Sequence, residues 1–370
     1  MLASVFSLAI TLLRLHAPAH STVQWVNVHL QESPGQLGAK DISQLQAQAE
    51  SGSATAQLKL ARAYAHGEGV PQDEELAAKW YRKAAEQGNS EAQDNLGALY
   101  LIGQGVERNK EEAVKWFRKS ARQGNASAMY RLGAAYYNGD GVPIDDSLSC
   151  AWFTLAKEAG NQDATEAVQR ADSELKPSTI TNAFKKIAEM YDKGGSLPEN
   201  QGEAARWWSK AAERGDNDAR VALAIKLING QGVPQDLARG RHLCNEAANR
   251  SDHRAEYCMG YIYQRGLGVS RDGKKARDWY KRAATHGDTV AINALASMEA
   301  SGEGGEIDRV NAFLLYARLA EKGDQDALRS LAKLRKEINP KEWEMLQKPL
   351  LHLRIVPSKL DLVLQKLGTP

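Results

Sequence analysis

Glycine recurs every 36 residues through most of this chain. The recurring positions are Gly52, Gly88, Gly124, Gly160, Gly215, Ser251, Gly287 and Gly323, and Ser251 takes the place of a glycine. One step is longer, because Gly160 and Gly215 are 55 residues apart, which is one period plus an insertion of 19. A period of this length is typical of arrays of helical hairpins, in which neighbouring hairpins share one continuous core.

The second unit shows why the period is helical. Its apolar residues lie three and four apart on both sides of a Gly-Gln-Gly-Val turn at residues 103–106, which predicts two amphipathic helices. Small residues at Ala92 and Gly97 allow close approach, while Trp116 and Phe117 fill the space between the helices. Trp80, Trp116 and Trp279 are therefore expected to anchor the core.

The same letters return in the other units. Glycine-rich turns fall at 67–70, 139–142, 230–233 and 266–269, and aromatic pairs at 80–81, 116–117, 152–153, 207–208 and 279–280. The pattern Ala-x-x-x-Leu-Gly-x-x-Tyr-x-x-Gly-x-Gly-Val, followed by Lys-Ala-x-x-Trp-Tyr-x-Lys-Ala-Ala-x-x-Gly, resembles the Sel1-like repeat family, relatives of the tetratricopeptide repeats. The resemblance covers residues 44–339 and implies an all-α, right-handed α-α superhelical solenoid of about seven repeats with helical caps, beginning with a half-unit at 44–52.

The 19-residue insertion near 161–179 has a counterpart after Gly323. Each reads as an extra helix ended by a proline, Pro177 in the first case and Pro340 in the second. Residues 340–370 are apolar in patches and are expected to form a C-terminal cap on the last repeat, or else a partner-binding tail.

The first residues resemble an export signal. An apolar run from Met1 to Leu13 precedes Ala17-Pro18-Ala19, a small-x-small site that predicts cleavage after Ala19. Residues 1–19 are then a signal peptide, residues 20–43 a linker, and the protein periplasmic or secreted. The start lacks a positive charge and Arg14 interrupts the run, so a cytoplasmic adaptor with an uncleaved leader stays open.

Charge argues against nucleic acid as a partner. The chain has 48 Lys plus Arg and 46 Asp plus Glu, a formal net charge of +2, which gives no field that would attract polyanions. The N-terminal apolar run is too short to span a membrane, so no transmembrane segment is expected.

Three cysteines do not make a disulfide framework. Cys244 and Cys258 lie seven residues before and after Ser251, at equal heights on either side of a turn. This placement allows a bridge in an oxidising compartment, or two small buried side chains that never bond. Cys150 has no evident partner.

The sequence offers no catalytic centre. The Gly-x-Gly segments lie between helices without a preceding strand, so they are turns and not phosphate loops. Ser-x-x-Lys occurs at Ser173 and Ser330 without a Lys-Thr-Gly or Ser-Asp-Asn segment, which leaves a penicillin-recognising protein or weak cell-wall hydrolase only as an alternative. The eight histidines show no metal-ligand spacing, and no metal or cofactor is expected.

A binding surface remains. By resemblance to tetratricopeptide arrays, the first helix of each unit lines a concave groove that would hold a peptide or protein. Aromatic and arginine side chains most often anchor such interfaces. The candidate groove residues are Arg62, Tyr130, Tyr137, Arg254, Tyr257, Tyr261 and Arg265. The expected function is a non-enzymatic protein interaction scaffold.

Overall fold

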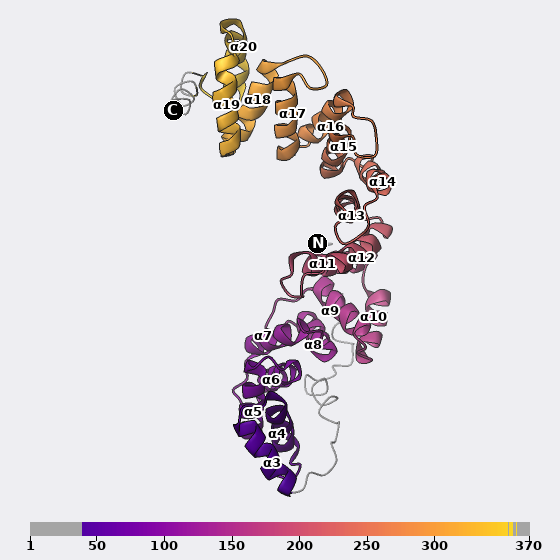
Figure 1. Ribbon diagram of the computed structural model, residues 1–370, viewed down its shortest axis with the longest axis vertical. Coiled ribbons are helices and arrows are strands. Elements are labelled where there is room, and N and C mark those ends of the chain that lie inside the picture. The colour runs from indigo at the N-terminus through magenta and orange to yellow at the C-terminus, as the bar shows by residue number, and fades with distance from the viewer. Residues whose placement is uncertain (1–38, 354, 358–359, 361–370) are drawn as a thin grey trace, which may run out of the picture. The chain divides into compact units, whose positions relative to one another are not determined.

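Helices alone build the part of the chain that the structure describes. A computed structural model describes residues 39–353, 355–357 and 360, and these residues form eighteen helices and no strand, as expected for an α-α solenoid (Figure 1). The signal peptide predicted at residues 1–19 lies outside this range. The chain divides into two compact units, Met1–Glu199 and Asn200–Pro370, and the division falls inside the fourth repeat.

The N-terminal unit contains nine helices in its described residues. They are α3 (Ala39–Glu50), α4 (Ala54–His66), α5 (Glu74–Glu86), α6 (Ser90–Ile102), α7 (Lys110–Ala121), α8 (Ala126–Asn138), α9 (Asp146–Glu158), α10 (Asp163–Glu174) and α11 (Pro177–Lys193).

The C-terminal unit also contributes nine helices within the described residues. They are α12 (Gln201–Glu213), α13 (Asn217–Asn229), α14 (Leu237–Ala248), α15 (His253–Arg265), α16 (Gly273–Thr285), α17 (Thr289–Ser301), α18 (Arg309–Glu321), α19 (Gln325–Glu337) and α20 (Pro340–His352).

Several hairpins are closed by an aromatic side chain of the second helix that packs against a glycine of the first helix. A Cβ placed on Gly97 of α6 would lie 2.6 Å from Cε1 of Phe117 on α7, so the ring occupies the space that a side chain would need. Phe117 is only 1% exposed. The fifth repeat has Ala224 and Cys244 at the two corresponding positions, a larger residue on the first helix and a smaller one on the second. The pair is therefore a packing unit whose total volume is limited.

Consecutive repeats interlock through the second glycine of the turn. At Gly141, which has φ +71°, a Cβ would overlap the carbonyl of Lys110 and lie 2.8 Å from the backbone nitrogen of Glu111. Lys110 begins the second helix of the preceding repeat, so main chain meets main chain at this point. The same approach to a backbone carbonyl recurs at Gly105, Gly232 and Gly304. The turn glycine thus sets the spacing between repeats.

The 19-residue insertion forms the predicted extra helix. After Gly160 the chain begins α10 in the place of a first helix, and Asn161 accepts a hydrogen bond from the backbone nitrogen of Ala164, 2.9 Å away. Pro177 then occupies the first turn of α11, where its missing N–H costs nothing, and α10 and α11 both pack on α9. The C-terminal cap repeats this plan, because α19 and α20 both pack on α18.

The cap that precedes the first repeat is longer than predicted. Helix α3 begins at Ala39, inside the segment 20–43 that we expected to be a linker, and it buries Leu45 and Ala49. Gln57 of α4 donates a hydrogen bond to the carbonyl of Ala49, 3.0 Å away. This bond joins α3 to the first repeat.

The expected core role of Trp279 is only partly correct. Trp80 and Trp116 are buried, but Trp279 is half-buried, because its ring rests on the edge of the fifth-repeat core and carries the Arg282 guanidinium 4.4 Å from its centroid. Lys83 and Lys119 cover Trp80 and Trp116 in the same way, three residues later on the same helix. These cation–π contacts shield the outer edge of each indole from water.

Candidate partner-binding face

The first helix of each repeat is held in a fixed register by its ends. In most of them an Asn or Asp side chain accepts a hydrogen bond from the backbone nitrogen of the third helical residue, as Asp288 does from Ala291 at 2.9 Å. Ser53 takes this role at α4, and α11 begins at Pro177 without a side-chain cap. A left-handed glycine stops the helix, as Gly266 does after α15. Corresponding side chains therefore recur every 36 residues, and a stripe on one first helix continues on the next.

In the C-terminal unit this stripe is apolar and accessible. Ile225 on α13 and Tyr261 on α15 are one period apart and are 45% and 38% exposed. Val290 on α17 is 54% exposed, and the rest of its stripe, Asn293 and Ser297, is exposed and uncharged. We call this set the α15 face. Its members are Ile225, Tyr257, Tyr261, Arg265, Val290, Asn293 and Ser297.

A tyrosine cluster supports the centre of the α15 face. Tyr257 is half-buried, and its ring centroid lies 5.4 Å from that of Tyr280 on α16. Burial raises the pKa of both hydroxyls, so both remain neutral. The Tyr280 hydroxyl donates to Gln264 Oε1 at 2.9 Å, and Gln264 Nε2 donates to Glu303 Oε2 at 3.1 Å. The face is thus backed by a fixed hydrogen-bonded core.

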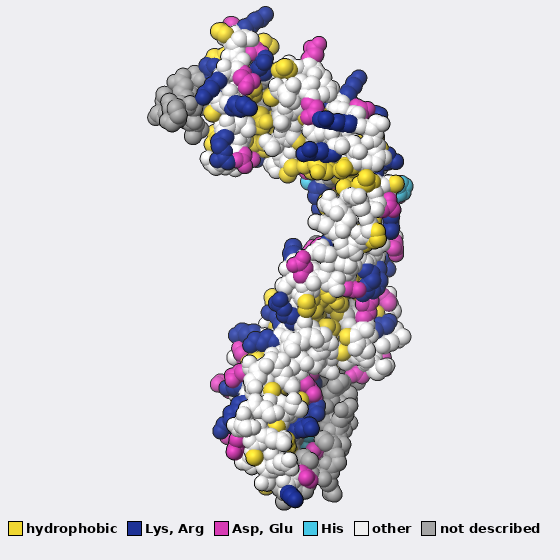
Figure 2. All heavy atoms as spheres, in the orientation of Figure 1, with side chains coloured by type: hydrophobic (Ala, Val, Ile, Leu, Met, Phe, Trp, Pro, Cys, Tyr) yellow, Lys and Arg dark blue, Asp and Glu magenta, His cyan; other side chains and the backbone are white. Residues whose placement is uncertain are grey.

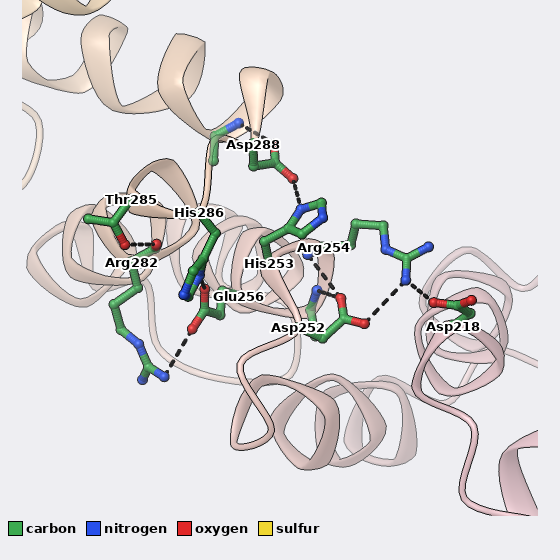
Figure 3. A network of polar contacts seen from close by, with 11 residues as sticks. Asp218, Asp252, His253, Arg254, Glu256, Arg282, Thr285, His286 and Asp288 are labelled. Carbon is green, nitrogen blue, oxygen red and sulfur yellow. Dashed lines mark hydrogen bonds and ion pairs between the residues drawn. The ribbon is translucent and has the colours of Figure 1, made fainter. Parts of the chain in front are cut away.

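Charged side chains border the α15 face at the N-terminal ends of α15 and α17 (Figure 3). Arg254 lies between two carboxylates, bonding Asp218 of α13 and Asp252, the latter at 3.2 Å. His253 Nδ1 lies 2.8 Å from Asp288 Oδ2. These pairs hold consecutive first helices together at one edge.

A second group in Figure 3 surrounds Glu256, whose side chain is 1% exposed. His286 Nδ1 lies 2.9 Å from its Oε2, and Arg282 approaches its Oε1 at 3.0 Å. In the first repeats an amide pair occupies these two positions, Gln57 with Gln87 and Gln93 with Gln123. The sixth repeat therefore has a carboxylate and an imidazole where the first repeats have two amides. A buried carboxylate needs such partners because desolvation is costly.

The predicted groove residues differ in availability. Tyr261 and Arg265 of the C-terminal unit are exposed, and so is Tyr137 of the N-terminal unit, at 36%. Tyr130 is half-buried and packs 5.3 Å from Phe153 between ring centroids. Arg62 pairs with Glu91, and Arg254 with Asp218 and Asp252. The arginines in ion pairs are poorer anchors, because a partner must first compete with a neighbouring carboxylate.

The same stripe is more closed in the N-terminal unit. Asp94 of α6 is buried and bonds Arg131 of α8 at 2.6 Å, with both side chains less than a tenth exposed. Ala98, one turn further along α6, is also buried. The accessible apolar surface of the first helices therefore lies mainly in the C-terminal unit.

Val290 is a member of the α15 face that is absent from the groove residues predicted from the sequence. It lies one period of 36 residues after Arg254, so the repeat spacing could have identified it.

The two cysteines that flank Ser251 are bonded in the structure. Cys244 of α14 and Cys258 of α15 have Cα atoms 6.2 Å apart, and both side chains are buried. Ser251 has φ 60°, and among the described residues it alone has a positive φ without being a glycine. Cys258 follows Tyr257 directly, so the bond restrains the helix that carries the α15 face.

Other kinds of site have little support in the described part of the chain. There is no cluster of three or more His, Cys, Asp or Glu side chains that could hold a metal ion, and no helix there is long and apolar enough to cross a membrane. The Ser173 hydroxyl donates to the carbonyl of Arg170, 2.9 Å away on the same helix. The Ser330 hydroxyl bonds Tyr316, whose pKa is raised mainly by burial. Positive and negative side chains are interspersed on the visible face of each unit (Figure 2).

These features define a class of protein: an α-α repeat array in which the periodic positions pack between helices. A sequence profile of the Sel1 repeat matches seven segments, residues 54–89, 90–125, 126–161, 186–216, 218–252, 253–288 and 289–324. The chain belongs to the Sel1 repeat family. Proteins of this family are generally scaffolds for protein–protein interaction.

Two solved structures are similar in sequence over most of the chain. One is a protective antigen of uropathogenic Escherichia coli with an SLR fold, 31% identical, with 83% of this chain and 70% of that chain covered and a TM-score of 0.45. The other is a Sel1 repeat protein from Oxalobacter formigenes, 28% identical, with 88% and 90% covered and a TM-score of 0.40. No curated protein matches the chain.

Proposed function

We propose that the protein is a non-enzymatic scaffold that holds a peptide or protein segment on the α15 face. The observation that carries the proposal is the exposed apolar stripe of Ile225, Tyr261 and Val290 on three consecutive first helices. Apolar side chains that are exposed one by one are ordinary, but their alignment on a rigid array offers a surface that a partner could dehydrate.

We also propose that the scaffold is exported. The apolar run at residues 1–13 and the small-x-small site before residue 20 support a cleaved leader. The Cys244–Cys258 bond supports the same compartment, because protein disulfides persist where the surroundings are oxidising. N-terminal sequencing of protein recovered from the native host tests this, and a sequence beginning at Met1 would favour a cytoplasmic adaptor instead.

The binding proposal is tested by a double substitution, Ile225→Ser with Tyr261→Ala. Both side chains are substantially exposed, so the melting temperature should stay within a few degrees of that of the wild-type protein. Capture of the partners that the wild-type chain retains from its host should fall. The control Ile144→Ser matches the Ile225→Ser part of the change, because Ile144 is 50% exposed in the N-terminal unit and Ile225 is 45% exposed.

Three outcomes separate the possibilities. Loss of capture in the double variant alone supports the α15 face. Equal loss in the Ile144→Ser control would mean that general surface apolarity is responsible. Unchanged capture, followed by loss when residues 353–370 are removed, would assign recognition to the C-terminal tail and refute the proposed site.

The penicillin-recognising alternative has a direct assay. A labelled penicillin should leave the wild-type protein unmodified, because Ser173 and Ser330 both make internal hydrogen bonds. Covalent labelling that disappears in Ser173→Ala or Ser330→Ala would overturn the non-enzymatic assignment.

A further inference from the structure

Arg265 is the uncommitted cation of the α15 face. It is exposed at the C-terminal end of α15, and its guanidinium carbon lies 5.8 Å from the centroid of the Tyr261 ring. Within the described residues it makes no ion pair or hydrogen bond. A cation resting beside an exposed aromatic ring presents its free N–H groups and the ring together.

The carboxylates around this face are already bonded elsewhere. Asp218 and Asp252 share Arg254 at the opposite end of α15. The charge of Arg265 also acts on Glu303. The pKa of Glu303 is lowered mainly by the hydrogen bond from Arg271, and the charge of Arg265 lowers it by a smaller amount. Its two oxygens accept from Arg271 at 2.6 Å and from Gln264 at 3.1 Å. Arg265 is therefore left with unmet capacity to bond a carboxylate.

The apolar part of the face lies within reach of this cation. Ile225 on α13 precedes Tyr261 by one period, and α13 and α15 pack against each other. Packed helices lie roughly 10 Å apart, which about three residues of an extended peptide would span. Asn293 and Ser297 on α17 are uncharged, so they add hydrogen-bonding groups without attracting or repelling a charged ligand.

We infer that the α15 face binds an extended acidic peptide segment, in which an apolar side chain packs on Tyr261 and Ile225 and a carboxylate lies about three residues or fewer away. The carboxylate accepts hydrogen bonds from the Arg265 guanidinium. This inference rests on the proposed function and specifies the chemistry of the partner.

The test is a selection of random phage-displayed peptides on four full-length proteins: wild type, Arg265→Glu, Tyr261→Ala and Arg239→Glu. Arg239 is an exposed arginine on α14 with no side-chain partner in the described residues, so its reversal matches the change in net charge away from the face. Peptides enriched on the wild type are then synthesised, and their affinities for all four proteins are measured.

We expect the wild type and Arg239→Glu to select peptides with Asp or Glu beside a large apolar residue. Arg265→Glu should bind these peptides about 10- to 100-fold more weakly, the loss expected for a hydrogen bond to a charged group, and should itself select Lys or Arg. Tyr261→Ala should also bind these peptides more weakly than the wild type.

The failing outcomes are distinct. Peptides that need Tyr261 but show no acidic preference, and that bind Arg265→Glu as tightly as wild type, would overturn this inference and leave the proposed function standing. No enrichment, or enriched peptides that tolerate both Tyr261→Ala and Arg265→Glu, would overturn the proposed function together with the inference.

Discussion

Replacing Gly141 by alanine should damage the stacking of repeats more than the same change at Gly124. Both glycines have left-handed φ values, +71° and +88°, so an alanine costs roughly 1–2 kcal/mol of backbone strain at either position. At Gly124 a Cβ meets nothing within 4 Å. At Gly141 it would overlap the carbonyl of Lys110, a backbone group that cannot rotate away as a side chain can.

The expected difference follows from that contact. Overpacking costs about 1–3 kcal/mol, so Gly141→Ala should lower the free energy of unfolding by about 2–5 kcal/mol, and Gly124→Ala by about 1–2 kcal/mol. The entropy that alanine removes from the unfolded chain is the same in both variants and cancels in the comparison.

Urea unfolding followed by circular dichroism measures the free energies of both variants. Hydrogen exchange at the first turn of α7 adds a local readout, because repeat arrays need not unfold in one step. Exchange there should accelerate in Gly141→Ala and stay unchanged in Gly124→Ala. Equal destabilisation of the two variants would refute the idea that the close approach at Gly141 sets the spacing of repeats.

Three further predictions concern the core, a buried acid and the disulfide. Trp152→Ala should cost about 3–5 kcal/mol because Trp152 is 1% exposed, and Trp279→Ala should cost clearly less in the same urea assay; equal costs would contradict the assigned burial. Burial raises the pKa of Glu299, so its charge penalises the folded state as pH rises through that pKa; Glu299→Gln should be more stable than wild type at pH 7, and the two should converge below the ordinary glutamate pKa of about 4.3. The intact mass should rise by two hydrogens on reduction, and a double variant, Cys244→Ala with Cys258→Ala, should lose about 3 kcal/mol of the free energy of unfolding. A thiol titration that finds three free cysteines in the exported protein would contradict the bond.

The sequence predicts the packing of this protein well because packing is what repeats. The spacing of the glycines and the aromatic pairs indicates every helical hairpin, and the extra helices predicted to end at Pro177 and Pro340 are α10 and α19. The start of α3 is missed because the cap carries no repeat letters, although α3 packs on α4 and Gln57 donates a hydrogen bond to the Ala49 carbonyl. The burial of Trp279 is overestimated because Trp279 packs against the neighbouring repeat, and that repeat has Cys244 where others carry an aromatic ring.

The candidate site is less predictable because availability depends on partners from other repeats. The residue type of Arg254 and Arg265 is the same, and both lie on one stripe of α15. Asp218, one repeat earlier, and Asp252, just before α15, hold Arg254 in ion pairs, whereas Arg265 makes no ion pair within the described residues. A pattern that records residue types at fixed spacing does not contain that distinction.

The departures from the repeat converge on α15. Ser251 replaces a junction glycine just before it, and serine holds φ at 60°, inside the ordinary left-handed well, where the seven corresponding glycines adopt φ between 84° and 102°. That junction is the one joined by Cys244 and Cys258, and Glu256 with His286 replaces the amide pair of the first repeats. The disulfide joins α15 to α14, and Arg282 of α16 adds a contact to the buried Glu256 of α15. A surface that must bind with little loss of conformational entropy benefits from such restraints, which argues that the helix carrying Tyr261 and Arg265 is the one this array has fixed in place.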